Sequence, residues 1–343
     1  MKRNRKRIIL VIILASASFW LIVRNGHNGT LTDKDFAVSD TASINKIFLA
    51  DKSGREITLE RKAQGGWTVN GKYDVRPDAI KTLLVTIKKV DVKEPIGKNA
   101  VNNVIKRLAA KAVKCEIYQN NKLVKAYYVG TETQDDTGTN MILIDLETMK
   151  PTEKPFITYI PGFEGYLTTR YFTEEQGWRD RTVLHYNPND IASVKVEVPF
   201  KTEENYLLTI KGNNQYEIKM LATNTLATNI DPLQVKQYLS YFQQQNFESF
   251  EVAINQKQID SVLKSVPLNI LTITDKKGVT NKITFYARYP LQRDLKDDNT
   301  GAPIQFDMSR MDALLNNGKD FVMLQYLAFG KILPPVDYFR KKN

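Results

Sequence analysis

The sequence predicts an α+β protein in which an N-terminal transmembrane helix precedes two tandem repeats of antiparallel sheet with packed amphipathic helices. Three observations lead to this prediction. The 343-residue chain opens with a basic block and sixteen uncharged residues, alternating segments typical of strands recur along it, and one helical pattern returns after 155 residues. The length also suits two domains better than one.

The N-terminal residues 1–24 are expected to form a cytoplasmic basic tip and a membrane anchor. Residues 2–7 read KRNRKR, and Ile8 to Val23 carry no charge. As a helix this run is roughly 24 Å long, slightly short of the hydrocarbon core. The basic block favours a cytoplasmic N-terminus, so the rest of the chain should lie outside the cytoplasm. A cleaved signal peptide, with Ala15 and Ala17 before the cut, is the alternative. Residues 25–43 are polar and are expected to form a tether.

Residues 44–150 and 191–343 are predicted to be two copies of one α+β unit. Pro77 and Pro232 each begin a helical pattern, since proline suits the first helical turn. The offset of 155 then continues without a gap to Cys115 and Ile270. Each copy is predicted to run β-β-β-α-α-β-β-β. The apolar positions expected to face the sheets are Ile80, Leu83, Leu84 and Ile87 in the first copy and Val235, Leu239 and Phe242 in the second.

Residues 151–190 form an aromatic-rich connector between the predicted copies. Two interpretations stay open for its rings: they fill a seam between the domains, or they form a surface for a partner. The block Trp178-Arg179-Asp180-Arg181 could pair internally or bind that partner. The aromatic residues of the connector are Phe156, Tyr159, Phe163, Tyr166, Tyr171, Phe172, Trp178 and Tyr186.

Composition excludes several classes of function. The net charge is +11, but six basic residues lie within residues 1–24, which leaves 43 basic against 38 acidic residues in the rest. This balance, and the expected export, argue against nucleic acid as a partner. A single cysteine excludes an intrachain disulfide, and two histidines exclude a histidine-rich metal site.

No motif for catalysis or cofactor binding is present, and we expect no enzyme activity, no catalytic residues, no cofactor and no metal. Three carboxylates near the aromatic connector, Glu164, Glu174 and Glu175, are the nearest candidates for glycoside cleavage. A calcium site is the second candidate, at Asp294, Asp297, Asp298 and Asn299, with a partial repeat at Asp135 and Asp136. The alternative is that these residues form tight turns, which use the same residue types. His27, His185 and Cys115 lack the neighbours that a nucleophilic site needs.

Three features occur together: the apolar N-terminal segment, Gly66-Trp67-Thr68-Val69-Asn70 before an amphipathic helix, and Trp178-Arg179-Asp180-Arg181. In these features the chain resembles a bacterial envelope family catalogued as a domain of unknown function, number four-three-four-zero. Members of that family often accompany gliding-type ABC transporter components. Tyr216 stands where the second copy would repeat Trp67. The resemblance implies an accessory or scaffold role in the envelope and carries no catalytic residues.

These observations predict a single-pass protein of the inner (cytoplasmic) membrane with its bulk in the periplasm. We expect it to act as an interaction or scaffold module of an envelope assembly, such as an ABC transporter accessory protein. Its expected partners are the inner membrane and other envelope proteins, with no nucleic acid and no small-molecule ligand. A glycan-binding or glycan-cleaving envelope protein is the alternative. Exposed aromatic residues beside converging carboxylates would favour that alternative.

Overall fold

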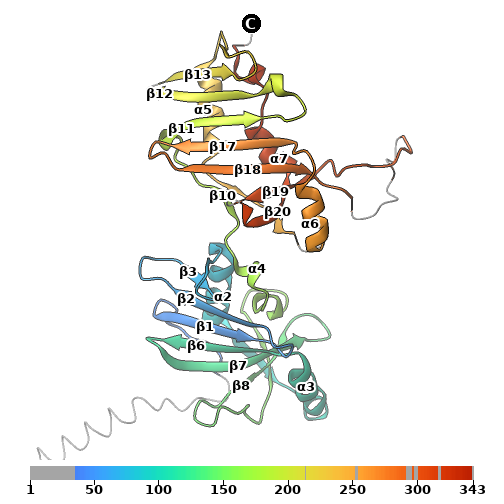
Figure 1. Cartoon of the computed structure of the whole chain (residues 1–343). Helices are drawn as coiled ribbons and strands as arrows, with labels where there is room; N and C mark the ends of the chain where they lie inside the picture. Colours follow the sequence, from blue (N-terminus) through green and yellow to red (C-terminus); the bar gives the residue numbers. More distant parts are fainter. Residues whose placement is uncertain are drawn as a thin grey trace, which may run out of the picture. The chain divides into compact units, whose positions relative to one another are not determined.

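A computed structural model describes residues 35–212, 214–251, 254–290, 296, 300–315 and 318–341. The chain divides into two compact units, with the boundary between Asp180 and Arg181. Each unit is built on an antiparallel sheet in which nine strands are described (Figure 1).

The first sheet has the strand order β4-β3-β2-β1-β6-β7-β8-β9-β5. Its strands are β1 (Ile44–Ala50), β2 (Glu56–Arg61), β3 (Trp67–Val69), β4 (Tyr73–Asp74), β5 (Asp91–Pro95), β6 (Val113–Gln119), β7 (Lys122–Glu132), β8 (Thr139–Leu143) and β9 (Phe156–Tyr159). The helices of this unit are α2 (Pro77–Lys89), α3 (Lys98–Lys111) and α4 (Glu175–Trp178), with the 3-10 turn η1 (Thr168–Arg170).

The second sheet has the order β14-β13-β12-β11-β17-β18-β19-β20-β16. Its strands are β11 (Ile191–Glu197), β12 (Tyr206–Gly212), β13 (Gln215–Met220), β14 (Thr225–Leu226), β16 (Ser249–Phe250), β17 (Asn269–Asp275), β18 (Thr280–Ala287), β19 (Arg310–Leu315) and β20 (Asp320–Gln325). A small ribbon pairs β10 (Thr182–Leu184) with β15 (Gln245–Asn246). The helices are α5 (Pro232–Ser240), α6 (Gln256–Leu263) and α7 (Tyr326–Phe329), with the 3-10 turns η2 (Pro188–Asp190), η3 (Thr202–Glu204), η5 (Gly330–Ile332) and η6 (Val336–Phe339).

The two units are repeats of one sheet-rich architecture. Each strand of the first sheet has a counterpart at the same place in the order of the second. The register aligns the copies residue by residue: Leu49 lies opposite Cys115 in the first, and Val196 lies opposite Leu271 in the second. Cys115 therefore corresponds to Leu271 rather than to Ile270, so the gap-free offset is wrong by one residue in this strand. Tyr216 occupies the place of Trp67, because it faces Ile210 as Trp67 faces Arg61.

The repeat continues to the end of each unit. The Trp178 carbonyl accepts a hydrogen bond from the Arg76 N–H at 2.9 Å, just before α2. In the second unit the Phe339 carbonyl accepts one from the Asp231 N–H at 2.7 Å, just before α5. Residues of the predicted connector up to Asp180 thus close the first unit as residues near Phe339 close the second. From the predicted tether, Phe36 and Val38 are buried in the core of the first unit.

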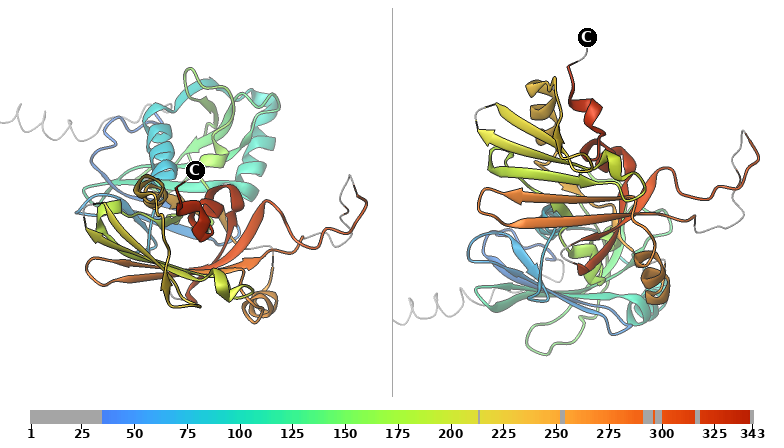
Figure 2. Two further views of the ribbon diagram at one scale, coloured as in Figure 1. Left: turned by 90° about the horizontal axis from the view of Figure 1, so that it is seen from above. Right: turned by 45° about the horizontal axis from the view of Figure 1, so that its top comes forward.

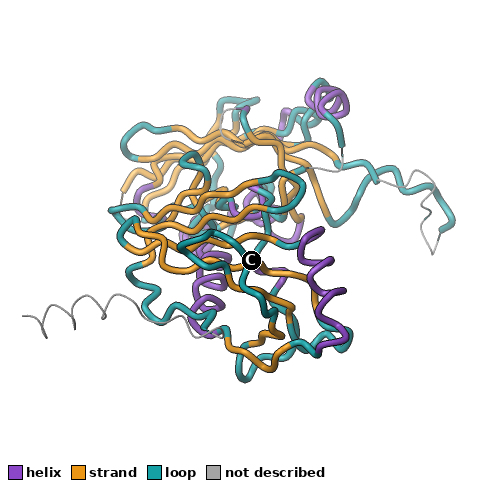
Figure 3. Tube along the Cα trace, turned by 90° about the horizontal axis from the view of Figure 1, so that it is seen from below, coloured by secondary structure: helices purple, strands orange, loops and turns teal. Residues whose placement is uncertain are grey.

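The predicted fold class is wrong. The described residues are mostly antiparallel sheet with few helices, as Figures 2 and 3 show, and they do not form an α+β arrangement with a transmembrane helix. Within the described ranges, no helix has the length and apolar character needed to cross a membrane. The predicted anchor, Ile8 to Val23, lies outside those ranges. The sheets are larger than predicted because short edge strands such as β4 and β14 extend each of them.

Helices α2 and α5 pack on the core face of their sheets. Pro77 and Pro232 lie in the first turn, and the Asp231 side chain caps α5 by accepting from the Leu233 N–H at 2.9 Å. In both helices the buried side chains are spaced three or four residues apart, as the apolar pattern in the sequence predicts. The buried apolar residues are Ile80, Leu83 and Ile87 in α2 and Val235, Tyr238 and Leu239 in α5, whereas Leu84 is only half-buried.

The opposite face of the first sheet is covered by α3, because a glycine lets the helix approach. A Cβ atom on Gly130 would come within 2.6 Å of Leu108 Cδ2 and 2.7 Å of the Asn140 carbonyl oxygen. Leu108 and Val104 of α3 form a small core there with Ile142. The corresponding strand position in the second unit is Tyr286, and no residue of α6 is buried.

Candidate interaction surface

The two units differ most where the seventh and eighth strands of the repeat are joined. Residues 133–138 form a short turn between β7 and β8. The corresponding loop of the second unit, between β18 and β19, spans residues 288–309. The described part of this loop lies at its base and around an isolated bridge between Lys296 and Pro303.

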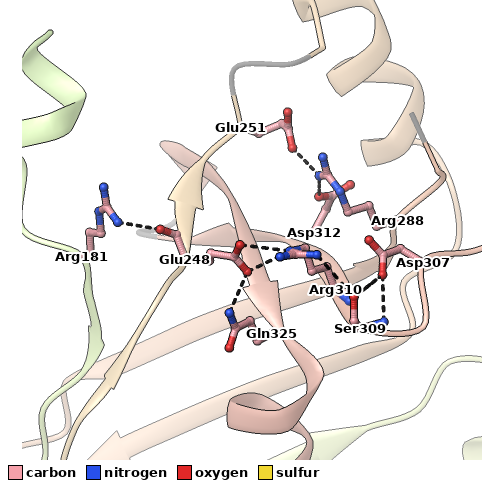
Figure 4. Close-up of polar contacts among 9 residues, drawn as sticks. All are labelled: Arg181, Glu248, Glu251, Arg288, Asp307, Ser309, Arg310, Asp312 and Gln325. Carbon is pink, nitrogen blue, oxygen red and sulfur yellow. Dashed lines mark hydrogen bonds and ion pairs between the residues drawn. The ribbon is translucent and has the colours of Figure 1, made fainter. Parts of the chain in front are cut away.

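A buried group of charges, here called the ion cluster, holds the start of this loop (Figure 4). It consists of Arg288, Glu251 and Asp312, and the Arg288 Nη1 atom contacts both carboxylates. The side chains are 8%, 2% and 4% exposed, respectively. Charge-assisted hydrogen bonds in such a dry site are strong, and breaking one leaves a buried charge without compensation.

The ion cluster holds two carboxylates against one guanidinium. Burial raises the pKa of Asp312 to about 6; Arg288 opposes that rise and the charge of Glu251 adds to it. The Asp312 carboxyl therefore binds a proton at a pH where an exposed aspartate would be ionised.

The end of the loop is fixed by a second set of contacts. The Arg310 Nε atom lies 3.0 Å from both carboxylate oxygens of Glu248, and Gln325 donates to the same carboxylate at 3.0 Å. Arg181 donates to the Glu248 carbonyl oxygen at 2.7 Å. These residues come from four separate segments of the second unit (Figure 4).

Asp307 joins the two ends of the loop. Its N–H donates to the Arg288 carbonyl oxygen at 2.8 Å. Its carboxylate accepts from the N–H groups of Ser309 at 2.8 Å and Arg310 at 3.0 Å. Burial alone would raise the pKa of Asp307, but these hydrogen bonds outweigh it and lower the pKa. An ionised Asp307 thus closes the loop base.

Three apolar side chains extend into solvent from this fixed base, and we call them the loop patch. Tyr289 is 58% exposed, Phe306 40% and Met308 85%. The rings of Tyr289 and Phe306 lie 5.2 Å apart at an angle of 46°. An exposed apolar group of this composition resembles the centre of a protein interface, where aromatic residues and methionine are enriched.

The aromatic connector does not form a comparable surface. Phe156, Tyr171 and Trp178 are buried in the core of the first unit, where the Trp178 Nε1 donates to the Phe172 carbonyl oxygen at 3.0 Å. The rings of Phe172 and Trp178 stack 4.1 Å apart. Phe163 is 39% exposed, and the Arg170 guanidinium lies over its ring. The glycan-binding alternative requires exposed aromatic rings, but most of the connector's rings pack against a hydrophobic core.

The candidate carboxylates of the connector contact structural partners. Glu174 pairs with Arg55, and Glu175 accepts from the Asn70 amide at 2.7 Å. Glu164 is exposed. Glu174 lines a recess with Asp51 and Arg55, and neither Glu164 nor Glu175 belongs to its lining.

The other residues considered for metal binding or nucleophilic catalysis do not form a site either, where the structure describes them. The Asp135 carboxylate accepts from the hydroxyls of Thr133 and Thr137, both at 2.6 Å, which is the geometry of a tight turn. Cys115 is buried and His185 is exposed. In the parts of the chain that the structure describes, no three His, Cys, Asp or Glu residues gather as metal ligands would. His27 and the acidic group Asp294, Asp297, Asp298 and Asn299 lie outside those parts.

Sequence reasoning missed the ion cluster and the loop patch. One signal was available: Asp312 interrupts the otherwise apolar run Met311–Leu315, and a carboxylate on a buried strand requires a partner. The identity of that partner depends on long-range pairing. No family model, curated protein or solved structure matches the chain.

Proposed function

We propose that the chain is a non-enzymatic interaction module that acts outside the cytoplasm and binds a protein partner through the loop patch. The observation that carries this proposal is the exposure of Tyr289, Phe306 and Met308 on a base fixed by buried charges. Exposed apolar groups that the fold does not need are typical of binding surfaces.

The fixed base supports binding because it lowers the entropy cost of association. A flexible loop must be ordered when it binds, and each immobilised side chain subtracts from the affinity. Here the two ends of the loop are already joined by the Asp307 N–H and by the contacts of Arg288 and Arg310. The first unit, with a short turn at this place, offers no equivalent group.

The sequence supports a location outside the cytoplasm and a role in an envelope assembly. The basic block and the apolar segment up to Val23 are typical of export signals. The resemblance to an envelope family supports a scaffold role in an envelope assembly, such as an accessory of an ABC transporter. The partner of the loop patch would then be another envelope protein.

Site-specific photo-crosslinking in intact producing cells tests this proposal. A photoreactive amino acid replaces Met308 in the full chain, and a matched variant carries it at Val279, which is 62% exposed on the turn between β17 and β18. We expect one discrete crosslinked protein from position 308 and none from position 279. Phe306→Asp should abolish that crosslink. Equal capture from both positions, or capture that Phe306→Asp leaves intact, would contradict the proposal.

A further inference from the structure

Helix α3 of the first unit carries a strong positive charge. Its sequence, KNAVNNVIKRLAAK, contains four cations and no acid. The cations Lys98, Lys106, Arg107 and Lys111 are all exposed. Among the described residues none of the four forms an ion pair.

General features of helices do not account for these charges. A cation in the last turn stabilises the helix dipole, which explains Lys111. Lys98, however, lies in the first turn, where a positive charge is unfavourable. The fold does not require the charge either, because the corresponding helix α6 contains one cation, Lys257, and one acid, Asp260. The positive face of α3 therefore has no equivalent in α6.

The cations border a recess of about 610 Å³ between α3 and the end of β7. Lys106, Arg107 and Lys111 line it from the helix, and Glu132 and Asp136 line it from the opposite side. The lining therefore holds three cations and two carboxylates, a net charge of +1, which favours an anionic group such as a phosphate.

The exposed face of α3 also contains apolar atoms. Ile105 is 41% exposed, and Ala109 and Ala110 are exposed beside the cations. Helices that combine a cationic face with exposed apolar side chains bind at the interface of anionic bilayers, where charge attracts the helix and apolar groups enter the headgroup region. A soluble polyanion would use the cations but would not bury Ile105.

We infer that α3 binds the phosphate headgroups of anionic lipids and holds the first unit against a membrane surface. The inference goes beyond the proposed function, since it concerns a different unit and a different class of partner. Each cation at an anionic surface contributes a factor of about five in affinity, so removal of two should weaken binding about 30-fold.

A local probe separates binding by α3 from any binding by the N-terminal residues. Cys115 is buried, and burial raises the pKa of its thiol to about 12, so a thiol reagent should leave it unlabelled. A spin label is placed on Asn103→Cys, which is exposed and one turn from Lys106. The full chain is mixed with vesicles of phosphatidylcholine, alone or with an equal amount of phosphatidylglycerol.

We expect the label to lose access to a water-soluble nickel complex only on the vesicles that contain phosphatidylglycerol. Lys106→Gln with Arg107→Gln should abolish this protection, and 0.5 M salt should do the same. The matched control, Lys257→Gln with Lys264→Gln on the other unit, should retain it. Equal access on both vesicles, or protection that the α3 variant retains, would overturn the inference. Equal protection by soluble polyphosphate would overturn it too, in favour of a polyanion site. None of these outcomes depends on the loop patch.

Discussion

Asn140 and Asp312 occupy the same place in the two units, but their side chains make different contacts. The Asn140 amide donates to the carbonyl oxygens of Thr131 at 3.0 Å and Glu132 at 3.2 Å, which satisfies the backbone at an irregularity near the end of β7. Asp312 instead contacts the Arg288 side chain. A neutral contact accompanies a short turn in the first unit, and a charged contact accompanies a long loop in the second.

The neighbouring strand position shows the same divergence. Gly130 lets α3 pack on the first sheet, whereas Tyr286 occupies that place in the second. The strand order is nevertheless identical in both units. The two units therefore differ at paired positions on one face of the repeated sheet, beside α3 in the first unit and at the base of the long loop in the second.

Replacing Arg288 with methionine should destabilise the second unit by about 3–5 kcal/mol, because two buried carboxylates lose their shared cation. Urea unfolding of the full chain measures this. The three tryptophans, Trp20, Trp67 and Trp178, all precede the second unit. Circular dichroism should therefore show an earlier transition while the tryptophan fluorescence transition stays in place. A joint shift of both signals would contradict the separation of the two units.

Gly130→Ala should destabilise the first unit by about 1–3 kcal/mol, because the new Cβ meets Leu108 and the Asn140 carbonyl below 3 Å. Here the tryptophan fluorescence transition should shift. Gly97→Ala is the matched control in the same unit, since a Cβ at Gly97 meets nothing within 4 Å. If both variants unfold alike, the close approach of α3 is not what requires Gly130.

Asp312→Asn should make stability less dependent on pH between about 4 and 6. The folded protein raises the pKa of Asp312 above the ordinary value, to about 6. Between these two pKa values the folded state still binds a proton that the unfolded state has released. The contribution of Asp312 to the free energy of unfolding therefore falls as the pH rises to about 6, and above that pH it no longer changes. The asparagine removes this loss. Between pH 4 and pH 7 the stability of Asp312→Asn relative to the wild type should rise by about 2–3 kcal/mol in urea unfolding. A constant difference across that range would refute the raised pKa.

Asp74→Asn should change stability by less than about 1 kcal/mol. Asp74 pairs with Lys62 at 2.7 Å, but the two side chains are 62% and 38% exposed, and solvent screens such pairs. The contrast with Arg288→Met measures what burial adds to an ion pair in this protein. A loss above 2 kcal/mol at Asp74 would show that exposure is a poor guide to the strength of these pairs.

The local elements were predictable from sequence, and the size of the sheets was not. Helices α2 and α5 follow from prolines and apolar spacing, and β1 and β11 from alternation. Edge strands such as β4 have two residues and form only because a neighbour pairs with them, so no local pattern reveals them. The equivalence of Trp178 and Phe339 was hidden for a similar reason. Different side chains fill the same place, and only the backbone hydrogen bonds coincide.

The candidate site was the least predictable part. Arg288 and Asp312 are separated by a loop, and Glu251 lies on a third segment, so only the folded sheet brings them together. A repeat in the sequence predicts only the features that both copies share. The loop patch exists in one copy only.

Native-state hydrogen exchange of Arg288→Met against the wild-type full chain tests the central claim, that buried charges hold the loop base of the second unit. The informative amides belong to Asp307, Ser309 and Arg310, which are hydrogen-bonded at the base. We predict that they exchange much faster in the variant, while the amides of β7 and β8 keep their protection. Unchanged exchange at Asp307, Ser309 and Arg310 would contradict the claim, because the base would then be ordered without the ion cluster.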